Sequence, residues 1–432
     1  MFDLAVIGLG PAGLEVVDIA IRNGLKVVAF EECKLGGTCL NQGCIPTKSI
    51  LHNAKLYSNI NNASKFGFND IKADFSWQKI LDRKDAIISK FNKALELALS
   101  KKITLINSKA ELKYVDSNVQ IISNNITYQA KNIIIATGSQ PVEVKGLEFD
   151  HQFILNSDDM FKLSNLPQSI AIVGSGAIGL EWAKILSDFG VCVKLIEKAS
   201  NLAPAMDVDI QKRVERILKT SNIDFFKNDF IQKIENKKLI LKSGKELEVD
   251  TILCAVGRRA NIPKIINNEM KIIVNDDYST NIPNLYVVGD ANSEILLAHA
   301  ASYQAKIIMK KILFNERLEK KPVPSVIYIS PEIASIGLRE QDLDDISKYK
   351  IKKILIGSLA KSWCDDSSDG VVKVIIKDDL IVGAHVVSRE ASALISLFNI
   401  IIDKKITLSE ISEMIFPHPS YSEVLLEVAK ND

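Results

Sequence analysis

The sequence predicts an α/β protein with two open, parallel-sheet units and a smaller α+β unit at the carboxyl end. Three observations predict this organisation. The chain has 432 residues, far more than one ordinary domain of about 150 residues. One pattern of strand, glycine turn, helix and strand occurs twice. From about Pro322 the pattern changes to short strands followed by helices.

The two copies of the repeat have the same order and the same spacing. Each begins with a short apolar strand, at residues 4–7 and 170–173. A glycine turn, an amphipathic helix and a second strand follow, and an acid ends each copy. The acid lies 23 residues after the first glycine in both copies (31 − 8 and 197 − 174). The residues concerned are Gly8, Gly10, Gly13 and Glu31 in the first copy, and Gly174, Gly176, Gly179 and Glu197 in the second.

The spacing of these glycines has a physical reason. One glycine makes the tight turn, one lets a pyrophosphate approach the backbone, and one lets the helix pack closely on the strand. The acid then accepts hydrogen bonds from ribose hydroxyls. A lone match could be a structural turn, but the strand context and the acid make each copy specific. We therefore expect two Rossmann-like dinucleotide-binding domains.

Three further apolar runs end in glycine, as buried strands of an open sheet do. They cover residues 132–136, 251–256 and 285–288, and lead into Gly138, Gly257 and Gly289. The first two alone could be core strands with a turn. In the third, Asp290 follows the glycine directly, at the end of a strand where a ligand would lie.

Composition excludes several classes of protein. The 47% hydrophobic and 25% charged residues are typical of a globular protein, and the net charge of +1 predicts neither a nucleic-acid nor a membrane partner. The longest uncharged apolar stretch, 391–402, is too short to span a bilayer. The amino terminus has no basic leader, so we expect a cytoplasmic protein. Six cysteines are too few for a secreted disulfide framework, and we expect no metal site.

Cys39 and Cys44 lie between glycines just after the first acid. On a regular helix, residues five apart are separated by about 8 Å along the axis, whereas a disulfide needs Cα atoms about 4.4–6.8 Å apart. A bridge would therefore need distorted backbone, which Gly43 permits. Pro46 fits the first turn of a helix, so Cys44 would lie near its positive end, where a thiolate is favoured. Two inert core cysteines are the alternative.

Residues 36–48 resemble the active-site signature of the pyridine nucleotide–disulfide oxidoreductases. Further signatures follow in the family's order over essentially the whole chain, at 136–139, 174–181, 256–259, 287–290 and 418–423. The resemblance implies a redox-active Cys39–Cys44 disulfide and the cofactors FAD and NAD. It implies cofactor binding by Gly8, Gly10, Gly13, Glu31, Lys48, Thr137, Gly138, Ser139, Asp290 and Ala298 on the FAD side, and by Gly174, Gly176, Gly179, Glu181, Glu197 and Gly257.

His418 and Glu423 form a candidate acid–base pair. An isolated histidine is more often a satisfied polar residue than a catalyst. Here two prolines, Pro417 and Pro419, restrict the backbone around the ring, and a carboxylate five residues on could orient it. The resemblance places this pair across a homodimer interface, facing the other subunit's cysteines. It implies four catalytic residues: Cys39, Cys44, His418 and Glu423.

The resemblance also implies domain limits and a reaction. We expect an FAD-binding domain at 1–145 with 266–321, an NAD-binding domain at 146–265 and a dimerisation domain at 322–432. Thr47 stands where glutathione and trypanothione reductases carry lysine, and Glu197 would repel a 2′-phosphate, which favours NAD. Residues 428–432 lack the cysteine pair that usually ends mercuric reductase, and Cys39 stands where transhydrogenase lacks a cysteine. Gln42, Ala177 and 388–389 depart from the family pattern.

The predicted function is the oxidation of dihydrolipoyl groups with NAD⁺. The expected partners are a second copy of the chain and a lipoyl-bearing acyltransferase or carrier protein, from a 2-oxo acid dehydrogenase complex or a glycine cleavage system. Two alternatives stay open at this point. One is an NAD(P)H-dependent reductase of another disulfide or of mercuric ion. The other is a flavin-bearing structural subunit of a multienzyme complex.

Overall fold

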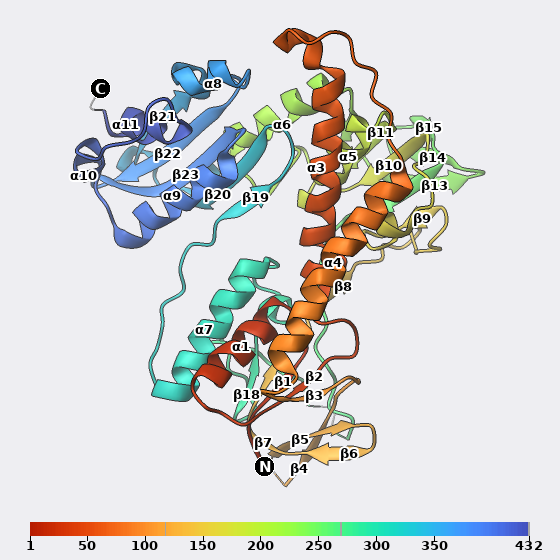
Figure 1. The fold of residues 1–432 in the computed structure, drawn as a ribbon, viewed down its shortest axis with the longest axis vertical. Helices are drawn as coiled ribbons and strands as arrows, with labels where there is room; N and C mark the ends of the chain where they lie inside the picture. The colour runs from red at the N-terminus through yellow and green to blue at the C-terminus, as the bar shows by residue number, and fades with distance from the viewer. Residues whose placement is uncertain (117, 268–269, 431–432) are drawn as a thin grey trace.

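A computed structural model of the chain describes residues 1–116, 118–267 and 270–430, so Asn431 and Asp432 lie outside it. Figure 1 shows three lobes. The amino-terminal sheet is at the bottom, the second sheet at the upper right and the carboxyl-terminal unit at the upper left. The long helix α3 (Cys44–Asn61) runs between the two upper lobes.

The first sheet is parallel throughout and covered on both faces. Alternate residues of its central strand point to opposite sides. Leu4 and Val6 pack under the helices, and Ala5 and Ile7 pack under a small antiparallel sheet. The strand order is β18 (Leu285–Val287), β7 (Ala130–Ile135), β1 (Phe2–Ile7), β2 (Val27–Phe30) and β3 (Thr104–Ile106); the cover is α1 (Pro11–Arg22), α7 (Ala298–Phe314), β4 (Glu111–Val115), β5 (Asn118–Ser123) and β6 (Ile126–Tyr128).

The second sheet repeats this architecture. Ile170 and Ile172 pack under two helices, and Ala171 and Val173 pack under a second antiparallel sheet. The strand order is β12 (Asp224–Lys227), β11 (Cys192–Glu197), β10 (Ser169–Val173), β16 (Thr251–Cys254) and β9 (Ile154–Leu155); the cover is α5 (Ala177–Asp188), α6 (Val208–Thr220), β13 (Ile231–Glu235), β14 (Lys238–Leu241) and β15 (Glu246–Glu248).

The carboxyl-terminal unit is an antiparallel sheet with helices, so the predicted α/β fold with an α+β end is confirmed. Its core joins the sheet to the helices that follow it. The strand order is β19 (Ser325–Ile327), β20 (Glu332–Gly337), β23 (Leu380–Ser388), β22 (Val371–Lys377) and β21 (Lys350–Leu355); the helices are α8 (Ala360–Cys364), α9 (Ala391–Lys404), α10 (Leu408–Ser412) and α11 (Val424–Ala429).

The remaining elements connect these units. The ribbon of β8 (Ser139–Pro141) and β17 (Arg258–Ala260) links the segments leaving β7 and β16. The short helix α2 (Gly37–Asn41) precedes α3, and α4 (Trp77–Leu99) packs against α3. The 3₁₀ turns are η1 (Ala63–Phe66), η2 (Asp159–Lys162), η3 (Gly289–Asn292), η4 (Glu340–Asp342), η5 (Ile346–Lys348), η6 (Ile356–Ser358) and η7 (Tyr421–Glu423).

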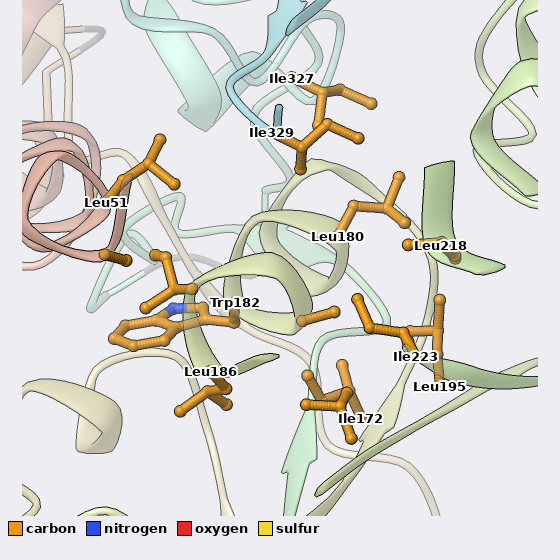
Figure 2. Packing of buried hydrophobic residues seen from close by; sticks show 14 of the residues in the cluster. Leu51, Ile172, Leu180, Trp182, Leu186, Leu195, Leu218, Ile223, Ile327 and Ile329 are labelled. Atoms are coloured by element: carbon orange, nitrogen blue, oxygen red, sulfur yellow. The ribbon is translucent and has the colours of Figure 1, made fainter. Parts of the chain in front are cut away.

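One hydrophobic core joins α3 and α4 to the second sheet and to the carboxyl-terminal unit. Figure 2 shows Leu51 of α3, Trp182 of α5, and Ile327 and Ile329 of the carboxyl-terminal unit in this core. Trp182, Ile327 and Ile329 are each at most 2% exposed. The segment that carries the cysteines is therefore fixed against both of the other units. None of the helices in the described ranges combines the length and apolar character that a membrane span requires.

The structure places strand ends within a residue or two of the expected positions. The run 251–256 ends as a strand at Cys254, because Val256 is 40% exposed and Gly257 has φ +129°. The domain limits at 145/146, 265/266 and 321/322 stay a prediction. Each sheet nevertheless draws its strands from the expected segments, and β18 returns to the first sheet after the second is complete.

Candidate active site

The two glycine turns have the same geometry. A Cβ on Gly13 would lie 2.0 Å from the carbonyl oxygen of Gly8, and a Cβ on Gly179 would lie 2.0 Å from that of Gly174. Only glycine permits this closeness between helix and strand. Gly8 and Gly174 have φ of +92° and +100°, which glycine adopts readily. Both turns therefore have the shape that the repeat predicts.

The two acids also occupy matching positions. Glu31 Oε2 accepts a hydrogen bond from the Leu9 N–H at 2.7 Å. In the second unit, Glu197 Oε2 accepts from the Ser175 N–H at 2.8 Å and from the Ser175 hydroxyl at 2.6 Å. Each carboxylate is about nine-tenths buried. Each is fixed beside its glycine turn, where the predicted contact with ribose would be made.

The turns fit a dinucleotide phosphate. Among the described residues, no atom lies close enough to contact a Cβ built on Gly176, so the outer side of this turn is open. Within the same ranges, no side chain caps the amino terminus of α1 or α5. Their first N–H groups and the positive end of the helix dipole are thus available to an anion. This supports FAD at α1 and NAD at α5.

Polar residues at the carboxyl ends of the strands form one cluster. Asp290 Oδ2 accepts a hydrogen bond from the Ser139 hydroxyl at 2.6 Å, and Arg258 Nε donates to the same hydroxyl at 2.8 Å. The Thr137 hydroxyl donates to the Asn261 carbonyl. Ligands of open α/β sheets bind at such strand ends. The structure thus brings Ser139 and Asp290 together. Gly138 and Gly257 directly precede β8 and β17, and Ala298 is the first residue of α7.

The cysteines lie on two different helices. Cys39 is in α2, and Cys44 is the first residue of α3. The helix is broken at Gln42 and Gly43, and Gly43 has φ −142° and ψ −108°. A Cβ on Gly43 would lie 3.0 Å from the Thr38 carbonyl oxygen. The predicted backbone distortion is therefore present, and it lets the two half-buried side chains meet as free thiols.

The two thiols differ strongly in acidity. The hydrogen bond from Cys39 and the positive charge of Lys48 lower the pKa of Cys44 to about 7, against the opposing effect of burial. The same hydrogen bond raises the pKa of Cys39, and burial raises it further. Near neutral pH, Cys44 is thus the thiolate of the reduced pair and Cys39 the protonated thiol. The amino-terminal position of Cys44 in α3 acts in the same direction.

Lys48 is bound between the first and second units. Its Nζ donates to both oxygens of Glu181, at 2.9 and 2.7 Å. Glu181 belongs to α5 and is only 4% exposed. Lys48 lies four residues after Cys44, on the same face of α3. The ion pair thus joins α3, the helix that begins at Cys44, to α5, the helix of the second glycine turn.

His418 and Glu423 form the predicted hydrogen-bonded pair. Nδ1 of His418 lies 2.8 Å from Glu423 Oε1, and Glu423 Oε2 accepts from the Ser420 N–H at 2.8 Å. The contact with His418 lowers the pKa of Glu423, so this carboxylate stays ionised. The imidazole side chain is 72% exposed. The carboxylate thus orients a ring that is open to the outside of the protomer.

One protomer does not bring this pair to the cysteines. Figure 1 shows α10 and α11, which flank the pair, at the outer edge of the carboxyl-terminal unit, with its sheet between them and α3. The resemblance to the family implies that the pair faces the cysteines of another subunit. The separation within one chain fits that expectation.

Three residues of the site were not among the predicted site residues, although Ser175 and Arg258 lie within the signatures at 174–181 and 256–259. Ser175 fixes Glu197, Arg258 fixes Ser139, and the N–H of Tyr328 donates to Glu181 Oε1 at 3.0 Å. Arg258 follows Gly257 directly, so its place at a strand end was a usable signal. The contact of Tyr328 joins residues 147 apart in sequence, and no local pattern indicates it.

Comparison with known proteins agrees with the fold and the cysteine signature. The family model described as pyridine nucleotide-disulphide oxidoreductase matches residues 2–305, and the model of that family's dimerisation domain matches residues 323–429. Proteins called dihydrolipoyl dehydrogenase from Bacillus subtilis, Mycoplasma genitalium and Chlamydia pneumoniae are 32%, 30% and 32% identical to this chain. The alignments cover 99% of this chain and 97%, 98% and 96% of those proteins.

Two solved structures share the fold. LpdA from Mycobacterium tuberculosis has a TM-score of 0.90 at 22% identity, over 99% of both chains. RclA from Escherichia coli, described as an HOCl-induced flavoprotein disulfide reductase, has a TM-score of 0.85 at 22% identity, over 98% of both chains. At this level of identity they show the architecture alone.

The two dinucleotide-binding turns, together with two cysteines on either side of a helix break, define an FAD-dependent oxidoreductase that works through a disulfide. The family matches extend over nearly the whole chain. The chain belongs to the pyridine nucleotide-disulphide oxidoreductase family, with FAD and NAD as its cofactors, and it carries the family's dimerisation domain.

Proposed function

We propose that the protein oxidises dihydrolipoyl groups with NAD⁺. Its relatives from three bacteria carry the name dihydrolipoyl dehydrogenase, which supports this proposal. The observation that carries the proposal is the unequal thiol pair. Cys44 is the acidic thiol beside Lys48, and Cys39 is the protonated one. A pair of this kind provides one sulfur for exchange with a substrate and one that holds negative charge inside the protein.

The proposed reaction starts from the Cys39–Cys44 disulfide. His418 of a second copy, oriented by Glu423, takes the proton of one dihydrolipoyl thiol. The resulting thiolate attacks Cys39 Sγ, the S–S bond breaks, and Cys44 leaves as a thiolate. The second lipoyl thiol loses its proton and attacks the lipoyl sulfur of the mixed disulfide. Cys39 leaves and takes up a proton, so the lipoyl dithiol is oxidised and the cysteine pair is reduced.

FAD, when bound, supplies the two-electron link between the cysteine pair and NAD⁺. The residues proposed to hold it include those of the first glycine turn, Glu31, and the polar cluster of Ser139 and Asp290. Lys48 of α3 and Glu181 of α5 form the ion pair that joins the cysteine-bearing helix to the helix of the second turn, so they would orient the groups that react. Glu197 would select NAD over NADP, because its carboxylate repels a 2′-phosphate.

The proposal includes two protein partners and a location. The dimerisation domain supports a homodimer, and the place of α10 and α11 at the outer edge of the carboxyl-terminal unit, with its sheet between them and α3, supports it further. The second partner is the lipoyl-bearing acyltransferase or carrier of a 2-oxo acid dehydrogenase complex or a glycine cleavage system. We place the protein in the cytoplasm, where a reducing environment keeps exposed cysteines such as Cys192 and Cys364 reduced.

A side-by-side assay tests the proposal. The FAD-loaded protein is given dihydrolipoamide with NAD⁺ or NADP⁺ and, in the reverse direction, NADH with lipoamide, glutathione disulfide or mercuric ion. We expect turnover with the lipoyl pair and NAD(H) to exceed every other combination by at least about 100-fold. Faster reduction of glutathione disulfide or mercuric ion would replace the proposal with another reductase. Absence of turnover with every substrate would favour a structural subunit.

A further inference from the structure

Tyr328 of the carboxyl-terminal unit contacts the Lys48–Glu181 ion pair in two ways. Its backbone N–H donates to Glu181 Oε1 at 3.0 Å. Its ring lies under the Lys48 ammonium, with Nζ 4.7 Å from the ring centroid. A cation within about 6 Å of an aromatic centroid is attracted by the electron-rich face. One residue thus contacts both members of the pair from a third part of the chain.

The position of the ring is fixed by its neighbours. Tyr328 follows β19 directly, and successive residues of extended chain point to opposite sides. Ile327 and Ile329, on either side of it, are 2% and 0% exposed. Figure 2 shows both isoleucines directed into the core formed with Leu51 and Leu180. Tyr328 itself is half-buried and packs against the same core, and its ring extends to Lys48.

Lys48 is the more exposed member of the ion pair. Its side chain is 34% exposed, while that of Glu181 is 5% exposed. A lysine has a long, flexible side chain, so an ion pair alone leaves the ammonium considerable freedom. The ring covers one side of it. The charged and titratable groups around this point are Glu181, Glu332, Cys44 and the neighbouring thiol Cys39.

We propose that Tyr328 is a positioning residue, whose ring holds the Lys48 ammonium where it stabilises the thiolate of Cys44. The carboxyl-terminal unit thereby helps to set the reactivity of a cysteine in the first unit. The inference rests on the redox role proposed for Cys39 and Cys44. In this proposal Tyr328 acts on Cys44 through Lys48 and not through a hydrogen bond to either cysteine sulfur.

The test compares three substitutions in a Cys39→Ser background, in which Cys44 is the only cysteine of the pair. Tyr328→Leu removes the ring, and Tyr328→Phe keeps it without the hydroxyl. Tyr57→Leu is the matched control, because Tyr57 packs on the same core but its ring stacks with Phe75 and Phe189. Tyr328→Met replaces the leucine variant if that variant does not fold.

The readout is the rate at which iodoacetamide alkylates Cys44 in the FAD-loaded protein, from pH 5 to 10. Mass spectrometry that localises the label separates Cys44 from the exposed Cys33, Cys192 and Cys364. The pH midpoint of the rate reports the thiolate and involves neither NAD nor a lipoyl substrate. A failed lipoamide assay therefore leaves this result intact, and the two proposals can fail separately.

We expect Tyr328→Leu to raise the midpoint by about half a unit or more, a roughly threefold loss of thiolate below the midpoint. Tyr328→Phe and Tyr57→Leu should stay within about 0.2 units of the parent. An unchanged midpoint in Tyr328→Leu would overturn the inference. So would an equal shift in Tyr57→Leu, which would show general loosening, or in Tyr328→Phe, which would assign the effect to the hydroxyl.

Discussion

A buried lysine joins the second unit to the carboxyl-terminal unit, and its removal should destabilise the protein strongly. Lys373 of β22 is 0% exposed. Its Nζ donates to Asp207 Oδ1 at 2.7 Å and to Asp209 Oδ2 at 2.9 Å, at the start of α6, and also to Glu340. Burial alone would lower the pKa of Lys373, but these hydrogen bonds raise it above its ordinary value. The lysine is therefore charged.

Lys373→Met would leave the Asp207 carboxylate without its cation. Asp207 is also 0% exposed. It would keep hydrogen bonds from the Asp209 and Glu340 N–H groups, and His385 Nε2 lies 3.8 Å from Asp207 Oδ2. Breaking a buried ion pair in this way costs about 3–5 kcal/mol. Lys353 provides the matched control. It lies opposite Lys373 on the neighbouring strand and its Nζ is 2.7 Å from Asp209, but it is 50% exposed. Lys353→Met should cost about 0–1 kcal/mol.

Urea unfolding of the FAD-loaded protein measures this difference. Flavin fluorescence and circular dichroism are followed together, and the midpoints are compared at a common slope. We expect Lys373→Met to unfold at clearly lower urea than Lys353→Met and the parent. Equal midpoints for the two variants, or a cost below about 1 kcal/mol for Lys373→Met, would refute the reasoning from burial.

Three further predictions concern the site. His418→Gln should lower lipoamide turnover by about 100-fold or more while NADH oxidation by artificial acceptors continues; unchanged lipoamide turnover would remove His418 from the reaction. Glu197→Gln should lower the preference for NAD over NADP in kcat/KM by about tenfold or more; a constant ratio contradicts the ribose contact. Because the pKa of Cys44 falls from 9.0 to about 7 on folding, its thiolate stabilises the reduced protein above pH 9, and this gain is lost as the pH falls through 7. Melting temperatures of reduced parent and Cys44→Ser should diverge as the pH rises over that window, and parallel curves would contradict it.

The parts of the fold that follow a local pattern could be predicted from the sequence. The glycine turns and their acids are set by contacts within about 23 residues, such as Leu9 with Glu31. Strands buried on both faces read as apolar runs, so both sheets could be expected. The break between Cys39 and Cys44 followed from helix geometry and from Gly43.

The parts that depend on distant pairing could not be predicted in this way. Lys373 meets Asp207 across 166 residues, and Tyr328 meets Glu181 across 147. In the sequence alone, Lys373 and Tyr328 look like ordinary polar and aromatic residues, because the partner of each lies in another unit. The relation of His418 to the cysteines needs a second copy of the chain, so it lies beyond the geometry of a single protomer.

An anaerobic titration of the FAD-loaded protein with dihydrolipoamide tests the redox role of Cys39 and Cys44. We expect two-electron reduction to produce a long-wavelength charge-transfer band from the Cys44 thiolate, and Cys44→Ser to abolish this band. Cys39→Ser should show such a band without any reductant, since Lys48 still favours the Cys44 thiolate and the serine hydroxyl can donate in place of the Cys39 thiol. A band that survives Cys44→Ser, or an absence of any reaction with dihydrolipoamide in the parent, would contradict this role.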